Sequence, residues 1–558
     1  MSKIEEFCSF MRKIGVEAFI LQTKGEYLNE YSEELTELCG FTGTNGVLII
    51  TQNGKCPFFT DGRYTTQAHN QLDQGNFQVY NIQEKDPCSW IKANTTSITT
   101  LGYYSKYFTI KDIRKYENIC ELKLHPIEKI NNYQKQAIVV HDIKYSSESS
   151  KDKCKKVATH IIEATLLTDS NSISWLLNLR NKNAQYTPCI LGRAILYKDG
   201  HVDLFIENKE YSTIEGELES HINIFDIGEL ESALNKLNSV VIDPSTTQVS
   251  IINMIKNKQV IEGENPCLPY KAIKNQTEIA GAINAHIKDG VAVTNFLCWL
   301  EDSIENKVTE LGIEEKLLEY RKEQELFKRL SFPTISAFNE NGAIIHYRAN
   351  NNTNKVIEGD GLYLIDSGGQ YLDGTTDITR TIAIGKPTSE QIFHYTVVLK
   401  AHIAIASAIF PAGTTGGELD ILARMQLWKF GMDYMHGTGH GVGSYLSVHE
   451  GPQAISKGNK IKLIPGMILS NEPGYYIPGK YGIRIENLMY IDQCENGFLC
   501  FKQLTCVPYD RRLIDVQMLT EDEIKWINDY HKFAYESLKD NIRGSIKLQQ
   551  SFTFKIAL

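Results

Sequence analysis

The sequence has no apolar run long enough to cross a membrane. Its longest apolar stretches, such as residues 404–410, end far short of the roughly 18 residues that a membrane helix requires. The first residues also lack the basic start and apolar stretch of a secretory signal. Positive charge is scarce too, because 58 lysines and arginines stand against 68 aspartates and glutamates, a net charge of −10. Since phosphate binding needs a concentrated basic face, we expect neither a membrane nor a nucleic acid as partner.

The cysteines lack the spacing of a metal site or a disulfide framework. All 12 are scattered, with no CxxC pair and no cluster. Scattered cysteines are typical of reduced thiols in the cytosol. We therefore expect a cytoplasmic protein whose cysteines are all reduced.

Several common catalytic motifs are missing as well. His449-Glu450 is not followed by the second histidine of an HExxH zinc motif, and no Gly-x-Ser-x-Gly elbow surrounds Ser367. The glycines within residues 436–443 have the wrong spacing for a GxGxxG dinucleotide motif, and no P-loop lysine is present. These absences disfavour zincins, α/β-hydrolases and nucleotide-binding enzymes.

The remaining composition is that of a folded protein of several domains. The chain has 558 residues, of which 42% are hydrophobic and 23% are charged. At roughly 150 residues per domain, this length predicts three or four domains.

The first part of the chain alternates strand and helix patterns. An Asn-Gly turn within residues 52–54 accepts the positive backbone angles of a hairpin. In chain order we expect strands at 17–21, 46–50 and 56–60, a helix at 63–72 and a strand at 77–80. A similar layout recurs later, with a helix that closes at Arg180 and strands at 194–197 and 202–206 joined by a glycine-bearing turn.

This recurrence predicts two related α/β domains, about residues 1–140 and 150–268, joined by the polar stretch 145–150. A third domain, 269–558, begins with a helix over residues 277–301. Its apolar face is expected at near-fourfold spacing, on Ile279, Ile283, Ile287 and Val291.

The third domain contains two hairpins that carry carboxylates. In the first, an apolar strand ends at Asp366, and a returning strand carries Asp377 near its start, eleven residues later. In the second, a strand ends at Glu472, and the returning strand carries Arg484 and Glu486. The period-two geometry of a strand would put Arg484 and Glu486 on one face, so that the arginine orients the carboxylate.

Together with an imidazole from residues 436–443, these carboxylates form a candidate metal cage. Four carboxylates that converge without cations would repel one another, and some would have to protonate. Two divalent ions would balance their charge, lower the pKa of a bridging water and polarise a scissile carbonyl. Oxygen-rich ligation with one histidine favours manganese, with cobalt or zinc as substitutes. Each element alone is more commonly a turn or loop residue, so the joint arrangement carries the inference.

The motifs of this region have a familiar pattern. They lie at residues 331–336, 342–347, 365–368, 373–381, 436–443 (His-Gly-Thr-Gly-His-Gly-Val-Gly), 448–452, 471–476 (Asn-Glu-Pro-Gly-Tyr-Tyr) and 482–487, and at 60–64 in the first domain. Together they resemble the metal-dependent pita-bread peptidases, and more narrowly the cytosolic three-domain Xaa-Pro aminopeptidases, the aminopeptidase P family. The resemblance implies a C-terminal pita-bread catalytic domain that follows the two α/β domains.

The resemblance also implies metal ligands at Asp366, Asp377, His440, Glu472 and Glu486. Asp377 and Glu486 would be shared between two divalent ions, Asp366 would complete one set of ligands, and His440 with Glu472 would complete the other. A hydroxide between the ions would attack the carbonyl that precedes a penultimate proline.

Further residues have roles only through the resemblance. Glu472 would carry a proton to the leaving proline nitrogen, and His346, His436 and His449 would act at the substrate. The residues implied in peptide binding are Arg63, His346, His440, His449 and Glu472. Tyr476 and Arg484 would support the metal ligands.

The resemblance further implies a homodimer whose substrates are peptides with proline in the second position. Two alternatives stay open: a dipeptidase of the same fold that cleaves only Xaa-Pro dipeptides, and an inactive relative that serves as a binding scaffold. Two departures from the family pattern stand out. The loop 181–186 lacks the expected glycine and acidic residue, and the tail beyond Ile542 differs.

Overall fold

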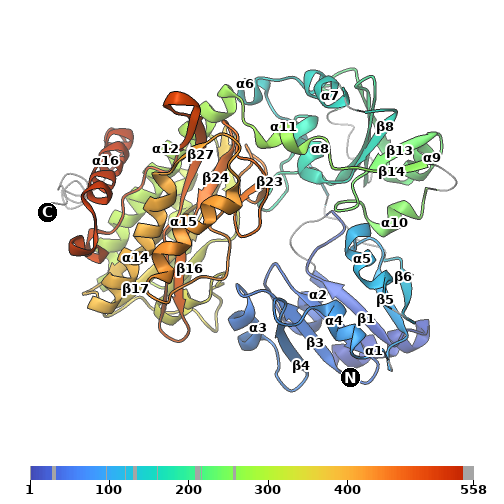
Figure 1. The fold of residues 1–558 in the computed structure, drawn as a ribbon, viewed down its shortest axis with the longest axis horizontal. Helices are drawn as coiled ribbons and strands as arrows, with labels where there is room; N and C mark the ends of the chain where they lie inside the picture. The colour runs from blue at the N-terminus through green and yellow to red at the C-terminus, as the bar shows by residue number, and fades with distance from the viewer. Residues whose placement is uncertain are drawn as a thin grey trace. The chain divides into compact units, whose positions relative to one another are not determined.

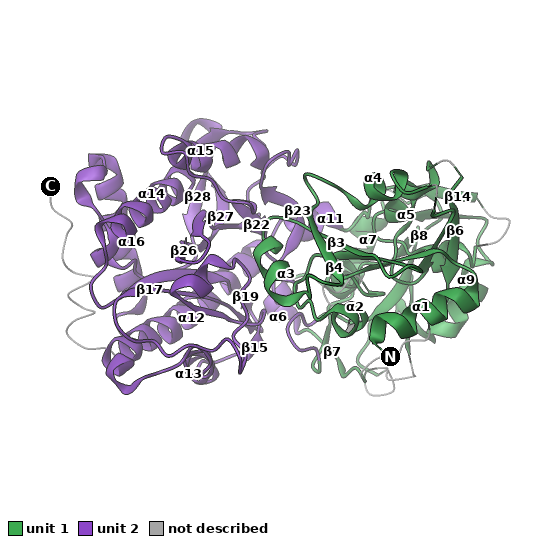
Figure 2. Ribbon diagram, turned by 90° about the horizontal axis from the view of Figure 1, so that it is seen from below, with its two compact units in different colours: residues 1–141, 148–183, 189–267 green, residues 142–147, 184–188, 268–558 purple. Residues whose placement is uncertain are grey.

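A computed structural model describes residues 2–27, 33–95, 97–119, 121–129, 135–159, 161–207, 214, 216–255 and 259–543 (Figure 1). The chain divides into two compact units, coloured separately in Figure 2. Unit 1 comprises residues 1–141, 148–183 and 189–267, and unit 2 comprises residues 142–147, 184–188 and 268–558. Within the described part of the chain, no helix combines the length and apolarity that a membrane span requires.

Unit 1 contains two six-stranded mixed sheets. The first, in the order β4-β3-β2-β1-β5-β6, consists of β1 (Ala18–Gln22), β2 (Val47–Thr51), β3 (Cys56–Thr60), β4 (Phe77–Asn81), β5 (Thr100–Tyr104) and β6 (Lys123–Ile127). The second, in the order β12-β11-β10-β8-β13-β14, consists of β8 (Ala164–Leu167), β10 (Gly192–Tyr197), β11 (Val202–Ile206), β12 (Ile222–Asp226), β13 (Ser239–Ile242) and β14 (Gln259–Glu262).

The two sheets have the same topology. Along each order, successive pairs are parallel, antiparallel, antiparallel, parallel and parallel. This agreement confirms the predicted relation between the two α/β domains. The boundaries proposed for the three domains stay predictions.

Unit 1 also contains several helices and one pair of short strands among its described residues. The helices are α1 (Lys3–Ile14), α2 (Glu33–Cys39), α3 (Thr65–Gln71), α4 (Pro87–Lys92), α5 (Ile110–Glu117), α7 (Ser150–Ala158), α8 (Ser170–Leu176), α9 (Leu230–Leu234) and α10 (Val249–Ile252). A separate pair is formed by β7 (Ile138–Val140) and β9 (Leu179–Asn181).

Two local expectations need correction. The helix predicted to close at Arg180 ends at Leu176, because Asn178 has a positive φ of 52° and residues 179–181 pair with β7. In the turn between β2 and β3, Gly54 has a positive φ of 82°, whereas Asn53 does not. The hairpin is therefore present, but glycine alone provides the left-handed conformation.

The described residues of unit 2 form four sheets. They are β16 (Ile335–Phe338), β17 (Gly361–Ser367) and β20 (Ile378–Ile384); β15 (Phe327–Leu330), β18 (Gly369–Tyr371) and β19 (Gly374–Thr375); β25 (Gly474–Ile477) and β26 (Tyr481–Arg484); and, in the order β21-β28-β27-β24-β22-β23, β21 (Ile409–Pro411), β22 (Gly439–Gly441), β23 (Glu450–Ile455), β24 (Ile468–Asn471), β27 (Asn487–Gln493) and β28 (Phe498–Gln503).

Two helix pairs cover these sheets (Figure 2). The apolar residues of α12 (Gln276–Ser303) and α13 (Glu310–Lys322) pack against β16, β17 and β20. Those of α14 (Ser389–Ala406) and α15 (Gly416–Trp428) pack against β24, β27 and β28. The other helices of unit 2 are α6 (Ile143–Ser146), α11 (Leu268–Ala272) and α16 (Glu521–Leu538).

The long helix predicted at 277–301 is present as α12, and much of its expected apolar face is confirmed: Val291 is buried, and Ile279 and Ile287 pack partly buried against core clusters. Ile283 is 38% exposed, whereas Ala282, Ala285, Asp289 and Phe296 are buried. The small residues are favoured there because strand β19 packs closely on the helix: a β-carbon at Gly374 would touch Ala282 and Ala285.

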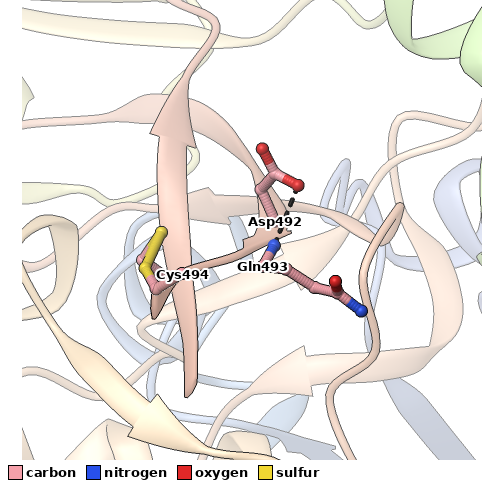
Figure 3. Close-up of a disulfide and its surroundings, with 4 residues drawn as sticks. Asp492, Gln493 and Cys494 are labelled. Carbon is pink, nitrogen blue, oxygen red and sulfur yellow. Dashed lines mark hydrogen bonds between the residues drawn. A yellow bond between two sulfur atoms is a disulfide. The ribbon is translucent and has the colours of Figure 1, made fainter. Parts of the chain in front are cut away.

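The expectation that all cysteines are reduced is wrong at one place. Cys494 and Cys500 form a disulfide bond (Figure 3). The antiparallel pairing of β27 with β28 sets Asp492 opposite Cys500 and so brings the two cysteines together, with their Cα atoms 6.0 Å apart. The other described cysteines form no disulfide bond with one another, and Cys120 lies outside the described residues.

Of the two predicted departures from the family pattern, the loop 181–186 lies within the described residues and the tail beyond Ile542 lies almost wholly outside them. Ala184, within the divergent loop 181–186, accepts a hydrogen bond from Arg329 through its carbonyl, and both residues belong to unit 2.

Candidate metal centre

The five predicted ligands lie in strands of unit 2 or directly beside them. Asp366 lies in β17, Asp377 directly precedes β20, and His440 lies in β22. Glu472 directly follows β24, and Glu486 lies in the break between β26 and β27. These strands belong to three different sheets, so the tertiary fold alone can bring the side chains together.

Three of the five meet in a compact group. Ligand atoms of Asp377, His440 and Glu486 all lie within 4.8 Å of one another. His440 Nε2 is 3.5 Å from an oxygen of Asp377 and 3.6 Å from an oxygen of Glu472. The imidazole therefore lies between two carboxylates, as a shared metal site requires.

Asp366 adjoins the same group and has a protein cation as partner. Arg484 Nη2 donates to Asp366 Oδ2 over 2.6 Å. Asp366 Oδ1 is buried and has no hydrogen-bond partner among the described residues. A buried carboxylate oxygen without a partner is costly unless something positive receives it.

This pairing corrects the expected role of Arg484. The returning strand is not continuous through residue 486, because β26 ends at Arg484 and pairs with β25, whereas β27 begins at Asn487 and pairs with β24. Arg484 therefore contacts Asp366 directly. Its charge lowers the pKa of Glu486, and a hydrogen-bonded link runs through Thr379, whose hydroxyl accepts from Arg484 Nε over 3.1 Å and donates to Glu486 Oε2 over 2.7 Å.

The pKa values of these residues show that the group has too little positive charge to balance its carboxylates. Burial raises the pKa of Asp377 to about 6, with the Asp366 carboxylate adding to the rise and His440 opposing it. Burial and the charges of Asp377, Glu472 and Asp366 raise the pKa of Glu486 well above its usual range. Burial lowers the pKa of His440, but the hydrogen bond to Asp377 and the charge of Glu472 more than offset this and raise it to about 9. The protein groups alone therefore hold protons where divalent cations would remove them.

The predicted histidines around the group lie at different distances from it. His449 packs edge-to-face on His440, with ring centroids 4.4 Å apart. His436 Nε2 is hydrogen-bonded to the hydroxyl of Tyr476 over 2.9 Å, and its Nδ1 is 3.8 Å from Glu472 Oε2. Tyr476 in turn accepts from Arg484 Nη1 over 2.8 Å, so Tyr476 links Arg484 to His436.

His346 and Arg63 come from other elements of the fold than the five predicted ligands. His346 is half-buried and follows the 3₁₀ helix η4 (Asn339–Ala343), which packs on β26 at Gly342 and Gly482. Arg63 lies in unit 1, where it forms an ion pair with Asp61 over 2.7 Å. Their roles at the substrate stay predictions.

Two hydroxyl residues of the group were missed at the level of sequence. Thr379 connects Arg484 to Glu486, and the hydroxyl of Ser470 accepts from the backbone N–H of His440 over 2.9 Å and lies 3.4 Å from Glu472 Oε1. Thr379 is two residues from Asp377, and Ser470 two residues from Glu472. Because alternate residues of a strand share a face, hydroxyls at this spacing could have been predicted.

Glycine explains how the histidine-bearing strand fits. A β-carbon at Gly439 would collide with the carbonyl of Ser470 in β24. The Gly-rich stretch 436–443 is therefore required for close packing of β22 on β24, which places His440 beside Glu472.

Four family models match the chain in order. The N-terminal domain of creatinases and prolidases matches at residues 3–133 and, as a second model, at 129–278. Metallopeptidase family M24 matches at residues 281–493, and the C-terminal region of this peptidase family matches at 497–552. These matches confirm the expected order of two N-terminal domains followed by a pita-bread catalytic domain.

Full-length relatives carry one activity in their names. Xaa-Pro aminopeptidase 1 of Dictyostelium discoideum is 37% identical, covering 96% of this chain and 92% of the relative. Aminopeptidase P1 of Lotus japonicus is 32% identical, covering 93% of each chain.

Solved structures give the same result. The X-prolyl aminopeptidase of Caenorhabditis elegans, described as a cytosolic enzyme with a di-nuclear active site, superposes with a TM-score of 0.90 at 29% identity, over 100% of this chain and 98% of that one. The prolidase of Pyrococcus horikoshii superposes with a TM-score of 0.54 at 28% identity and covers 64% of this chain.

Proposed function

Because the chain belongs to the Xaa-Pro aminopeptidases of metallopeptidase family M24, we propose that it hydrolyses the peptide bond between an N-terminal residue and a penultimate proline. One observation carries the proposal: Asp377, His440 and Glu486 converge within 4.8 Å, with Asp366 and Glu472 beside them. Such a set of oxygens with one imidazole suits divalent cations in a hydrolytic site.

The protein groups fit a pair of ions. The buried, unpartnered Oδ1 of Asp366 and the raised pKa values of Asp377 and Glu486 are both relieved by positive charge. Asp377 and Glu486 would be shared, Asp366 would complete one set of ligands, and His440 with Glu472 would complete the other. The ions would supply Lewis-acid polarisation of the scissile carbonyl and a lower pKa for water. We propose Mn²⁺ for this oxygen-rich set, with Zn²⁺ or Co²⁺ as alternatives.

The chain's own residues would bind the peptide and move its protons. Glu472, 19% exposed at its side chain, would carry a proton to the leaving proline nitrogen. His449 beside His440, His436 beside Glu472, and His346 would hold the peptide around the scissile bond. Arg484 would keep Asp366 in place and Tyr476 would keep His436 in place, since each is hydrogen-bonded to that residue and Arg484 also donates to Tyr476. Arg63 is proposed as a peptide contact from unit 1.

A matched pair of substrates tests the activity. Purified protein loaded with Mn²⁺ should release arginine from Arg-Pro-Pro and leave Arg-Ala-Ala intact. The Arg-Pro dipeptide distinguishes the remaining alternative, because a dipeptidase of this fold would cleave Arg-Pro alone. The full-length match to an aminopeptidase, against 64% coverage by a prolidase, favours the tripeptide. No release from Arg-Pro-Pro would refute the proposed function, and release from Arg-Pro alone would identify the dipeptidase instead.

We also propose that the enzyme is a homodimer whose subunits meet at α15. Large apolar side chains on the outer face of this helix and just beyond it are between 37% and 50% exposed: Ile421, Leu422, Met425, Trp428, Phe430 and Met435. A patch of this kind on a folded protein marks an interaction site, and a second copy would bury it. Light scattering should give twice the chain mass for the wild type and the chain mass for Trp428→Glu.

We place the enzyme in the cytoplasm, as its Caenorhabditis elegans neighbour is described. Fractionation of cells that produce the protein would test this, because recovery from the medium or from membranes would contradict it.

A further inference from the structure

One buried arginine of helix α15 contacts the segment that carries His436 at several points. Arg424, 7% exposed, donates from Nε to Asp420 Oδ2 over 2.7 Å, within the same helix. Its Nη1 donates to Asp433 Oδ1 over 2.8 Å and to the carbonyl of Tyr434 over 2.9 Å. Its Nη2 donates to the carbonyl of His436 over 2.7 Å. One guanidinium thus holds three points of the chain between α15 and β22.

This segment depends on such contacts. Residues 432–438 form no helix or strand, so no ladder of backbone hydrogen bonds fixes His436. The ring of Tyr434 lies over the guanidinium, 4.2 Å from its central carbon. Beyond His436, Thr438 Oγ1 donates to Asp420 Oδ1 over 2.5 Å, and the Thr438 carbonyl accepts from the backbone N–H of Glu472 over 2.8 Å. Asp420 and Arg424 therefore tie down the chain on both sides of His436.

The position of His436 matters because its ring lies between two groups of the proposed site. Its Nε2 meets the Tyr476 hydroxyl at 2.9 Å, and its Nδ1 is 3.8 Å from Glu472 Oε2. A backbone shift at His436 would change both distances at once.

We propose that Arg424 is a positioning residue for His436, an inference that rests on the proposed peptidase function. The planar guanidinium is needed because it directs donors to Asp420, to Tyr434 and to His436 from one plane. A lysine ammonium could keep the ion pair with Asp420 but could not also reach the carbonyl of His436. The several N–H donors of Arg424 are thus more important for positioning His436 than its positive charge.

A double-mutant cycle between Arg424→Lys and His436→Ala tests this inference with Arg-Pro-Pro and Mn²⁺. With His436 unchanged, Arg424→Lys should lower kcat by about 10- to 100-fold, the loss expected when a catalytic group is misplaced by around 1 Å. KM should change by less than about threefold. In the His436→Ala background, Arg424→Lys should lower kcat no further, because the residue that it positions is gone.

A matched control separates positioning from general stability. Arg321 of α13 is fully buried and donates from Nε and Nη2 to Asp289 over 2.8 and 3.1 Å, so Arg321→Lys makes the same chemical change elsewhere in unit 2. It should lower Tm while kcat per folded molecule stays at the wild-type value. If Arg424→Lys does not fold, Arg424→Gln is used in the same cycle.

The outcomes are distinct. An unchanged kcat in Arg424→Lys, or an equal fall in both His436 backgrounds, would overturn the inference and leave the proposed function standing. A wild-type enzyme without activity on Arg-Pro-Pro would instead refute the proposed function.

Discussion

The hydroxyl of Thr379 provides a sharp test of how the chain holds its proposed metal ligands. It donates to Glu486 Oε2 over 2.7 Å and accepts from Arg484 Nε over 3.1 Å. Thr379 is fully buried, so water cannot replace either bond. Thr379→Val keeps the shape of the side chain and removes both bonds.

The size of the effect follows from these contacts. A buried hydrogen bond to a charged group contributes about 1.5–3 kcal/mol, which corresponds to a factor of roughly 10 to 150. This agrees with the roughly 10- to 100-fold loss of metal affinity seen when a residue that orients a metal ligand is removed. We therefore expect Thr379→Val to bind Mn²⁺ about 10- to 100-fold more weakly, with kcat largely restored at saturating metal.

Calorimetric titration of metal-free protein with Mn²⁺, together with activity over a range of Mn²⁺ concentrations, measures this change. Thr379→Ser is the matched control, because it keeps the hydroxyl and loses only a methyl group. Wild-type metal affinity in Thr379→Val would refute the reasoning, and so would an equal loss in Thr379→Ser, which would assign the effect to packing.

Three further predictions concern the same unit. Asp377→Ala and Glu486→Ala should each abolish turnover and bound metal, measured by elemental analysis of the folded protein; retained activity would contradict their sharing between two ions. Since an ion needs the neutral imidazole, the raised pKa of about 9 for His440 means that binding releases a proton at neutral pH. Apparent Mn²⁺ affinity should therefore rise about tenfold per pH unit toward pH 9 and level off above it, and a flat titration series would count against this assignment. Glu310 accepts from the backbone N–H of Phe338 and Lys355 and from the hydroxyl of Tyr347. Glu310→Gln should lower the free energy of unfolding by about 1–3 kcal/mol and raise KM by shifting His346. An unchanged KM would show that Glu310 does not position His346.

The repeated α/β architecture was predictable because its signals are local. Gly54 and the turn between β10 and β11 mark hairpins directly in the sequence, and the strands beside them are short apolar runs. The end of α8 was not predictable in this way. Asn178 takes up a left-handed conformation and residues 179–181 pair with β7, forty residues earlier, which is a tertiary interaction that overrides helical periodicity.

Spacing and resemblance predicted which acidic residues and which histidine lie together, but not the hydrogen bonds among them. Period-two reasoning assumed one strand from Arg484 to Glu486, whereas the strand changes partners between them, from β25 to β24. This change turns Arg484 toward Asp366 and leaves Thr379 to contact Glu486. Which strand a residue pairs with depends on the whole sheet, so a pattern within one strand could not reveal it.

The ion pair between Arg484 and Asp366 also changes the charge balance of the proposed two-ion site. Four carboxylates alone would be neutralised by two divalent cations, and any further anion would leave the site negative. Arg484, buried at 2.6 Å from Asp366, adds a permanent positive charge that the sequence argument left out. With His440 neutral, two divalent ions would then leave one net positive charge, which a single anion such as hydroxide would neutralise. Arg484 thus pairs directly with Asp366. Its charge only partly offsets the rise in the pKa of Glu486, and His440 only partly offsets that of Asp377, so Asp377 and Glu486 both keep raised pKa values. These are the two residues proposed to be shared, and their shortage of charge is the physical reason to place both ions against them.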